Sequence, residues 1–175
     1  MRKHIVLTAS GNDRPGVIEE FTRILVKHDG NIEASRMSRL GGAFAMLMLV
    51  SAPETKVEAL RTDLGEMQHA KFDVTTLITE VRDDASGPSF TPCGVTVTGA
   101  DHIGIIHQIA RYLSEQGINV ESMSTEVVAA PMSGSPLFTM QAVVRVPPQL
   151  SIADLREALE YITTEVGVEA SVIAP

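Results

Sequence analysis

The sequence has no tryptophan, a single cysteine at position 93, and only 4% aromatic residues. A lone cysteine can form neither an internal disulfide nor, by itself, a zinc site. No apolar run approaches the roughly 20 residues that a membrane span requires. The apolar stretch 5–7 that follows the basic N-terminus is too short for the core of a signal peptide. We therefore expect a cytoplasmic protein without a membrane segment.

Basic residues are also scarce, above all in the second half. The chain carries 14 Lys and Arg against 22 Asp and Glu, a net charge of −8. Residues 1–83 hold 11 basic and 12 acidic side chains, a net −1, whereas residues 84–175 hold 3 and 10, a net −7. Proteins that bind nucleic acid draw most of their affinity from Lys and Arg on phosphates. The charge distribution therefore predicts no direct binding to nucleic acid and none to anionic membranes.

The most informative feature present is an internal repeat at an offset of 88 residues. Segment 7–18 aligns with segment 95–106, and nine of the 27 positions between Leu7 and Glu33 are identical in the second copy. A period this long, seen twice, indicates two copies of one small domain. We predict domain 1 at residues 3–82, a polar linker rich in Pro, Gly and Ser at 83–92, and domain 2 at 93–175.

Each copy has the same predicted order of elements. Apolar residues alternate in the strands and recur at helical spacing in the helices. We expect Pro15 at the first helical position, Gly30 as a left-handed helix cap, and a capping box at Ser151 and Asp154. The first copy has predicted strands at 4–10, 31–39, 43–50 and 72–81, a loop at 11–14 and a hairpin turn at 40–42. The second has predicted strands at 94–99, 118–127, 137–146 and 169–173. The pattern is β-α-β-β-α-β twice, which predicts an α+β protein of two ferredoxin-like domains, each an antiparallel sheet with its helices on one face.

The run Gly11-Asn12-Asp13-Arg14-Pro15-Gly16-Val17-Ile18, followed by Asn31-Ile32-Glu33, resembles the ACT domain family. ACT domains are βαββαβ modules that bind small effectors, usually amino acids, at interfaces between copies. The second copy keeps Asp101, Gly104, Ile105 and Asn119, but His102-Ile103 replaces Arg14-Pro15.

Two such domains cover the whole chain, as in the tandem ACT proteins typified by the glycine cleavage system transcriptional repressor family. That resemblance implies a regulatory protein rather than an enzyme. It implies a glycine-like amino-acid effector, a protein partner and a homo-oligomer, with no cofactor, no catalytic residues and no metal site.

The turn before the first helix has a chemical rationale of its own. Gly16 and Gly104 place free backbone N–H groups and the positive end of the helix dipole where a carboxylate can approach. Asp13 or Asp101 could receive an ammonium group, and Asn31 or Asn119 could donate and accept hydrogen bonds. Since each Asn follows the helix, we expect it at the far end of its own domain, and a site that uses both groups must lie between domains or chains. The predicted effector-binding residues are Asn12, Asp13, Arg14, Pro15, Gly16, Val17, Ile18, Asn31, Asp101, His102, Gly104, Ile105 and Asn119.

Other readings of these residues stay open on the sequence alone. The motif is also compatible with a tight turn without a ligand. Arg14 could cradle a phosphate, as in the acylphosphatases that share this topology, and a ligand-free scaffolding pair of domains is a third possibility. His102 and His107 are poorly spaced for a metal site.

Overall fold

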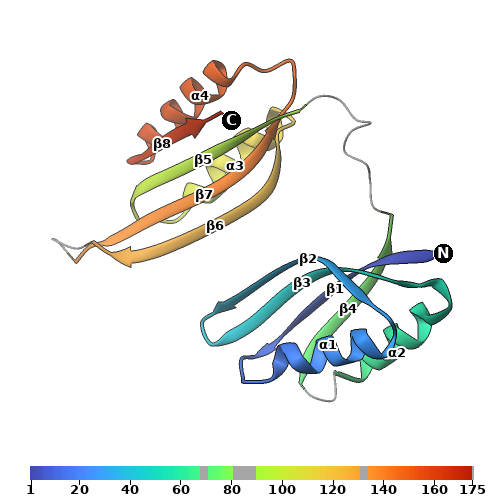
Figure 1. Ribbon diagram of the computed structural model, residues 1–175. Coiled ribbons are helices and arrows are strands. Elements are labelled where there is room, and N and C mark those ends of the chain that lie inside the picture. The colour runs from blue at the N-terminus through green and yellow to red at the C-terminus, as the bar shows by residue number, and fades with distance from the viewer. Residues whose placement is uncertain (68–70, 81–89, 131–133, 175) are drawn as a thin grey trace. The chain divides into compact units, whose positions relative to one another are not determined.

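The computed structural model describes residues 1–67, 71–80, 90–130 and 134–174, and the chain divides into two compact units, Met1–Asp83 and Asp84–Pro175 (Figure 1). Most of the predicted linker, residues 83–89, lies outside the described residues. Among the helices in the described parts, none is both long and apolar enough to cross a membrane.

The first unit, unit 1, is a four-stranded antiparallel sheet with the strand order β2-β3-β1-β4. Helices α1 and α2 lie on one face of this sheet (Figure 1). Its elements are β1 (Arg2–Asn12), α1 (Val17–Lys27), β2 (Asn31–Leu40), β3 (Ala43–Pro53), the short 3-10 helix η1 (Glu54–Lys56), α2 (Val57–Glu66) and β4 (Phe72–Thr79).

The second unit, unit 2, repeats this arrangement with the strand order β6-β7-β5-β8. Its elements are β5 (Thr91–Ala100), α3 (Ile105–Glu115), β6 (Asn119–Ala129), β7 (Pro136–Val146), α4 (Ile152–Glu165) and β8 (Val168–Ile173). The Ser151 hydroxyl accepts a hydrogen bond from the Asp154 backbone N–H at 3.0 Å, which begins α4 as expected. The prediction of two ferredoxin-like domains is confirmed.

A hydrophobic core lies between sheet and helices in each unit. In the middle of β1 every second side chain is buried, with Ile5, Leu7 and Ala9 at 1% exposure or less. From α1, Phe21 enters the same core and its ring meets that of Phe72 edge to face, with centroids 5.6 Å apart. Full burial of one such side chain stabilises the fold by about 1.5–3 kcal/mol, so this face of each helix fixes its position.

The edge strands β2 and β6 are exposed along almost their whole length. Each pairs on one side only, with β3 and β7 respectively. The outer backbone N–H and C=O groups of an edge strand are open to pairing with another chain. Like the opposite edge strands β4 and β8, they are therefore places where the sheets can be extended.

Three local predictions around the first turn are wrong. Strand β1 continues to Asn12, so Gly11 is a strand residue; a Cβ there would lie 2.5 Å from Phe72 Cδ1. Pro15 precedes the helix, because Gly16 is its N-cap. Asp29, with φ 54°, takes the left-handed conformation in place of Gly30. Gly30 is required for space instead, since a Cβ there would lie 3.0 Å from the Leu25 carbonyl oxygen.

The predicted linker also extends too far, because β5 begins at Thr91. Pro92 pairs with Arg145 of β7, whereas β8 pairs with β5 only from Gly94 onward. At Pro92 the strand therefore has a neighbour on one side only, and a residue without an N–H is tolerated at such a position.

Candidate functional site

The turn between β1 and α1 carries most of the predicted effector residues of unit 1. Gly16 is the N-cap of α1, with φ 91° and ψ −8°, and no side chain caps this helix. These angles match the third position of a type II turn, which favours Gly there and Pro immediately before it. The first N–H groups of the helix therefore have no side-chain acceptor, which leaves them for water or a ligand.

Unit 2 repeats this backbone geometry closely. Gly104 is the N-cap of α3, with φ 102° and ψ −7°, again without a side-chain cap. A Cβ at Gly104 would meet no atom within 4 Å, and one at Gly16 would meet only Glu20 Oε1 at 4.0 Å. The space beside both helix starts is therefore open, and glycine is required there by its positive φ.

Asp13 lies beside this turn and is held by the hairpin between β2 and β3. Its Oδ2 lies 3.1 Å from Nε of Arg39, and its backbone N–H donates to the Gly42 carbonyl oxygen at 3.3 Å. Asp13 is therefore paired with a guanidinium. Arg39 is absent from the sequence prediction, although β3 pairing with β1 necessarily brings the hairpin tip to the end of β1, where Asn12 faces Ala43.

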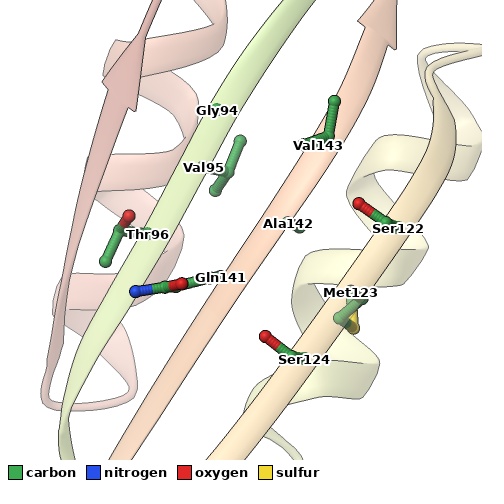
Figure 2. A pocket seen from close by; sticks show the side chains of 9 residues that line it. All are labelled: Gly94, Val95, Thr96, Ser122, Met123, Ser124, Gln141, Ala142 and Val143. Carbon is green, nitrogen blue, oxygen red and sulfur yellow. The ribbon is translucent and has the colours of Figure 1, made fainter. Parts of the chain in front are cut away.

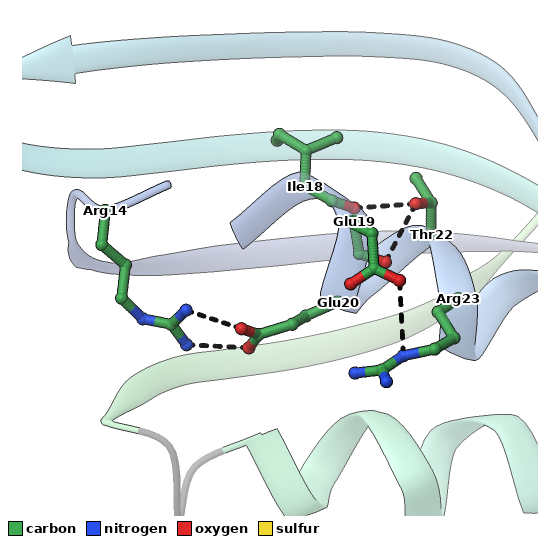
Figure 3. Close-up of polar contacts among 6 residues, drawn as sticks. All are labelled: Arg14, Ile18, Glu19, Glu20, Thr22 and Arg23. Carbon is green, nitrogen blue, oxygen red and sulfur yellow. Dashed lines mark hydrogen bonds and ion pairs between the residues drawn. The ribbon is translucent and has the colours of Figure 1, made fainter. Parts of the chain in front are cut away.

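Arg14 is paired with Glu20, whose Oε1 lies 4.0 Å from where a Cβ of Gly16 would be. The Arg14 guanidinium donates two hydrogen bonds to the Glu20 carboxylate, at 2.6 and 2.8 Å (Figure 3). It also lies 5.6 Å from the centre of the Phe72 ring. The hydrogen bonds from Arg14 lower the pKa of Glu20. With both ends of the guanidinium occupied, Arg14 is poorly placed to hold a phosphate, which weakens the acylphosphatase alternative.

The corresponding side chains of unit 2 are arranged differently. His102 contacts the carbonyl oxygens of Ile103 and Val166, which raises the pKa of its imidazole. Ile103, which replaces Pro15, is 102% exposed. Asp101 is exposed, and its charge contributes to the raised pKa of His102. The position of Arg39 is occupied in the repeat by Val127, which carries no charge.

The remaining predicted residues fall into three groups. Val17 and Ile105 are buried and anchor their helices, whereas Asn12 and Ile18 are exposed beside the turn. Asn31 pairs across the sheet with Ser51, which pairs with His4. At about 3.3 Å per strand residue, the nine residues from His4 to Asp13 put Asn31 about 30 Å from the turn.

Asn119 is equally distant from its own turn, since it pairs with Arg145 opposite Pro92. The structure therefore brings the Asp, the Gly and the helix start together in each unit and separates the Asn from them.

A second candidate feature is a hollow of about 390 Å³ on the face of the unit 2 sheet that the helices leave open (Figure 2). Gly94 contributes no side chain there, and Thr96, Ser122, Ser124 and Gln141 give it a polar border. The residue of unit 1 that aligns with Gly94 is Val6. Across the described ranges, no group of three or more His, Cys, Asp or Glu side chains is placed to hold a metal ion.

Comparison with known proteins gives a consistent picture. The family model of the ACT domain matches residues 3–78. Over 97% of its length the chain is 23% identical to the glycine cleavage system transcriptional repressor of Escherichia coli K12, covering 88% of that protein. A UPF0237 protein of Methanopyrus kandleri is 39% identical over 61 residues, 34% of this chain and 68% of that protein. An unknown protein from Galdieria sulphuraria superposes with a TM-score of 0.86 at 28% identity, over 100% of this chain and 99% of the other.

Proposed function

The chain belongs to the ACT-domain family, and on this premise we propose that it is a regulatory protein that binds a small amino acid at its strand–helix turns. The observation that carries the proposal is the repeated uncapped helix start at Gly16 and Gly104, with open space beside it and an aspartate three residues earlier. In this proposal effector binding changes the association of the protein with itself or with a protein partner. The name of the Escherichia coli relative favours a role in transcriptional control.

In unit 1 the two charges of an amino-acid zwitterion have matching partners. Its carboxylate fits the free N–H groups that follow Gly16, and Arg39 adds a positive charge nearby. Its ammonium group fits Asp13. An incoming zwitterion breaks the Asp13–Arg39 ion pair, but its ammonium group then pairs with Asp13 and its carboxylate with Arg39. Neither side chain is therefore left without an opposite charge. Glycine, with five heavy atoms, can gain at most about 7 kcal/mol, which corresponds to micromolar affinity at best.

In unit 2 the same chemistry uses fewer charges. Asp101 is available to an ammonium group, but no arginine stands at the position of Arg39. The exposed Ile103 offers an apolar contact instead. Unit 2 therefore favours an amino acid with an apolar side chain more than unit 1 does.

Each separated Asn can reach only the turn of another domain, and in this proposal that domain belongs to a second copy of the chain. If the β2 strands of two chains pair antiparallel at their free edges, the Asn31 end of one lies opposite the Leu40 end of the other. Arg39 and the Asp13 turn lie at that end. A homo-oligomer joined through β2 would thus complete each turn with Asn31 of the neighbouring chain.

Calorimetric titration of glycine into the full chain tests the proposal. The Asp13→Asn, Asp101→Asn doubly substituted protein removes both ammonium partners and should bind at least tenfold more weakly. Glu58→Gln with Glu115→Gln is the matched control for charge, because it also removes one exposed carboxylate from each unit, each paired with an arginine of its own helix. Equal affinity in all three proteins, or no heat from any of the common amino acids, would refute the proposed site.

Asn31→Ala tests the role of the second copy. It should weaken both glycine binding and self-association, the latter measured by sedimentation. Weakened binding by a strictly monomeric protein would show that the site is complete within one chain and that the pairing through β2 is wrong.

A further inference from the structure

A groove of about 510 Å³ runs between helices α3 and α4 of unit 2. Its lining residues are Tyr112, Asp154, Glu157, Ala158, Tyr161 and Ile162. The chain contains only two tyrosines, and both line this groove. Aromatic rings beside carboxylates are an arrangement that recognises cations, since the ring faces and the carboxylates both attract positive charge.

The tyrosines of α3 and α4 interact electrostatically with nearby carboxylates. The Tyr161 hydroxyl, on a side chain 66% exposed, donates to Glu165 Oε1 at 2.9 Å, and this hydrogen bond raises its pKa. Burial, with a contribution from the charge of Asp154, raises the pKa of the half-buried Tyr112. Both tyrosine hydroxyls therefore stay protonated at physiological pH, and both side chains lie near ionised carboxylates.

The three basic side chains between positions 84 and 175 contact groups other than the groove carboxylates. Arg156 donates to the Val172 carbonyl oxygen at 3.2 Å, and Arg145 lies 3.4 Å from Glu121 and over the Phe90 ring. Arg111 faces Glu115 on its own helix, at 3.8 Å. Within the described part of the chain, Asp154 and Glu157 therefore have no cationic partner.

The equivalent helix pair of unit 1 shows the contrast. There Asp63 of α2 accepts from Lys27 Nζ of α1 at 2.7 Å and lies 2.7 Å from Nε2 of His28. These contacts join α1 to α2 and neutralise the carboxylate. Nothing comparable joins α3 to α4 among the residues that can be described, so the groove stays open and negative.

We propose that the groove between α3 and α4 is a docking site for a lysine- or arginine-bearing segment of a protein partner. The basic side chains pair with Asp154 and Glu157 and lie against the two tyrosine rings. Apolar parts of the same segment cover Ala158 and Ile162, which form the half-buried floor. The inference rests on the proposed function and deepens it, because it assigns the contact with a partner to a helix surface distinct from the effector turns.

The groove supplies its own spectroscopic probe. Because there is no tryptophan and both tyrosines line the groove, tyrosine emission reports on this surface alone. The probe is a capped ten-residue peptide of repeated lysine, leucine and glycine, and its control replaces each lysine by glutamine. The lysine peptide should change the emission saturably and bind about tenfold more weakly in 500 mM than in 50 mM NaCl, because salt screens its charges. The glutamine peptide should bind at least tenfold more weakly than the lysine peptide.

Two doubly substituted proteins locate the contact. Asp154→Asn with Glu157→Gln should reduce affinity for the lysine peptide at least tenfold, measured by calorimetry. Glu126→Gln with Glu169→Gln removes the same charge from the sheet strands β6 and β8 and should change it less than twofold. Tyr161→Ala should weaken binding more than Tyr161→Phe, which keeps the ring. All substituted side chains are exposed, and thermal unfolding checks that each protein is folded.

Equal binding of the two peptides, or equal losses in the two doubly substituted proteins, would overturn the docking site. Glycine titration of the groove-substituted protein separates this proposal from the effector site. Normal glycine binding with peptide binding lost supports both proposals. Peptide binding at the groove in a chain that binds no amino acid would leave the docking site standing and refute the effector site alone.

Discussion

Replacement of Gly104 by alanine isolates the cost of the left-handed helix start. A Cβ at this position would meet nothing within 4 Å, so the substitution creates no clash and its cost is conformational. With φ at 102°, a residue other than glycine is strained by about 1–2 kcal/mol. For a unit of about 80–90 residues, each kcal/mol lowers the melting temperature by roughly 4–8 °C. We therefore expect the unit 2 transition to fall by about 5–15 °C.

Circular dichroism during thermal unfolding measures this change, and two variants frame it. Gly104→Asn should cost less than Gly104→Ala, because Asn is tolerated at this turn position. Gly65→Ala in α2 also adds a Cβ without neighbours, but without a positive φ, and should raise stability by about 0.5–1 kcal/mol. If Gly104→Ala were neutral or stabilising like Gly65→Ala, the reasoning that glycine is required by the backbone would be refuted.

Three further outcomes follow from packing and charge. Gly99→Ala should lower the free energy of unfolding of unit 2, measured by chemical denaturation, by about 1–3 kcal/mol or more, because its Cβ would lie 2.7 Å from the Val168 backbone. This loss should exceed that of Gly104→Ala. Cys93 is 2% exposed and burial raises its thiol pKa, so a thiol reagent should label it only at the opening rate of unit 2; fast labelling of the native protein would contradict this. The hydrogen bond from Lys27 lowers the pKa of Asp63, so its stabilising effect is fully present above the unfolded pKa near 4 and is lost as pH falls through the lower folded-state pKa. Asp63→Asn should lower the melting temperature at pH 7, and by progressively less as the pH falls below about 4; an effect that did not diminish with falling pH would contradict this.

The sequence predicted the fold because its signals are local and occur twice. Alternating apolar residues such as Ile5, Leu7 and Ala9 define a strand with one buried face, and helical spacing defines α1 equally well. Because the sequence repeats at an offset of 88 residues, each element predicted in the first copy is also predicted in the second. Element ends were less accurate, since Gly11 and Pro92 normally indicate a turn or a loop and only a neighbouring strand shows that they continue a sheet.

Part of the candidate site could be predicted from the sequence in the same way. Asp13 and Gly16 are only three positions apart in the sequence, so their proximity could be predicted without coordinates. The large distance of Asn31 from them could be predicted as well. Arg39 could not be assigned from the motif, because its contact with Asp13 crosses 26 positions and depends on the register between β1 and β3.

Backbone conformation and side-chain partners were decided only by the tertiary structure. The sequence has a glycine at the same turn position in both copies but does not say whether space or φ demands it, and the empty surroundings and positive φ of Gly104 answer that question. Arg14 and His102, aligned in the repeat, have different partners because Glu20 is present in one copy and Gln108 in the other. Local patterns thus determine which elements form. The docking of those elements determines which polar groups remain free to bind, because a contact between distant segments has no local signal.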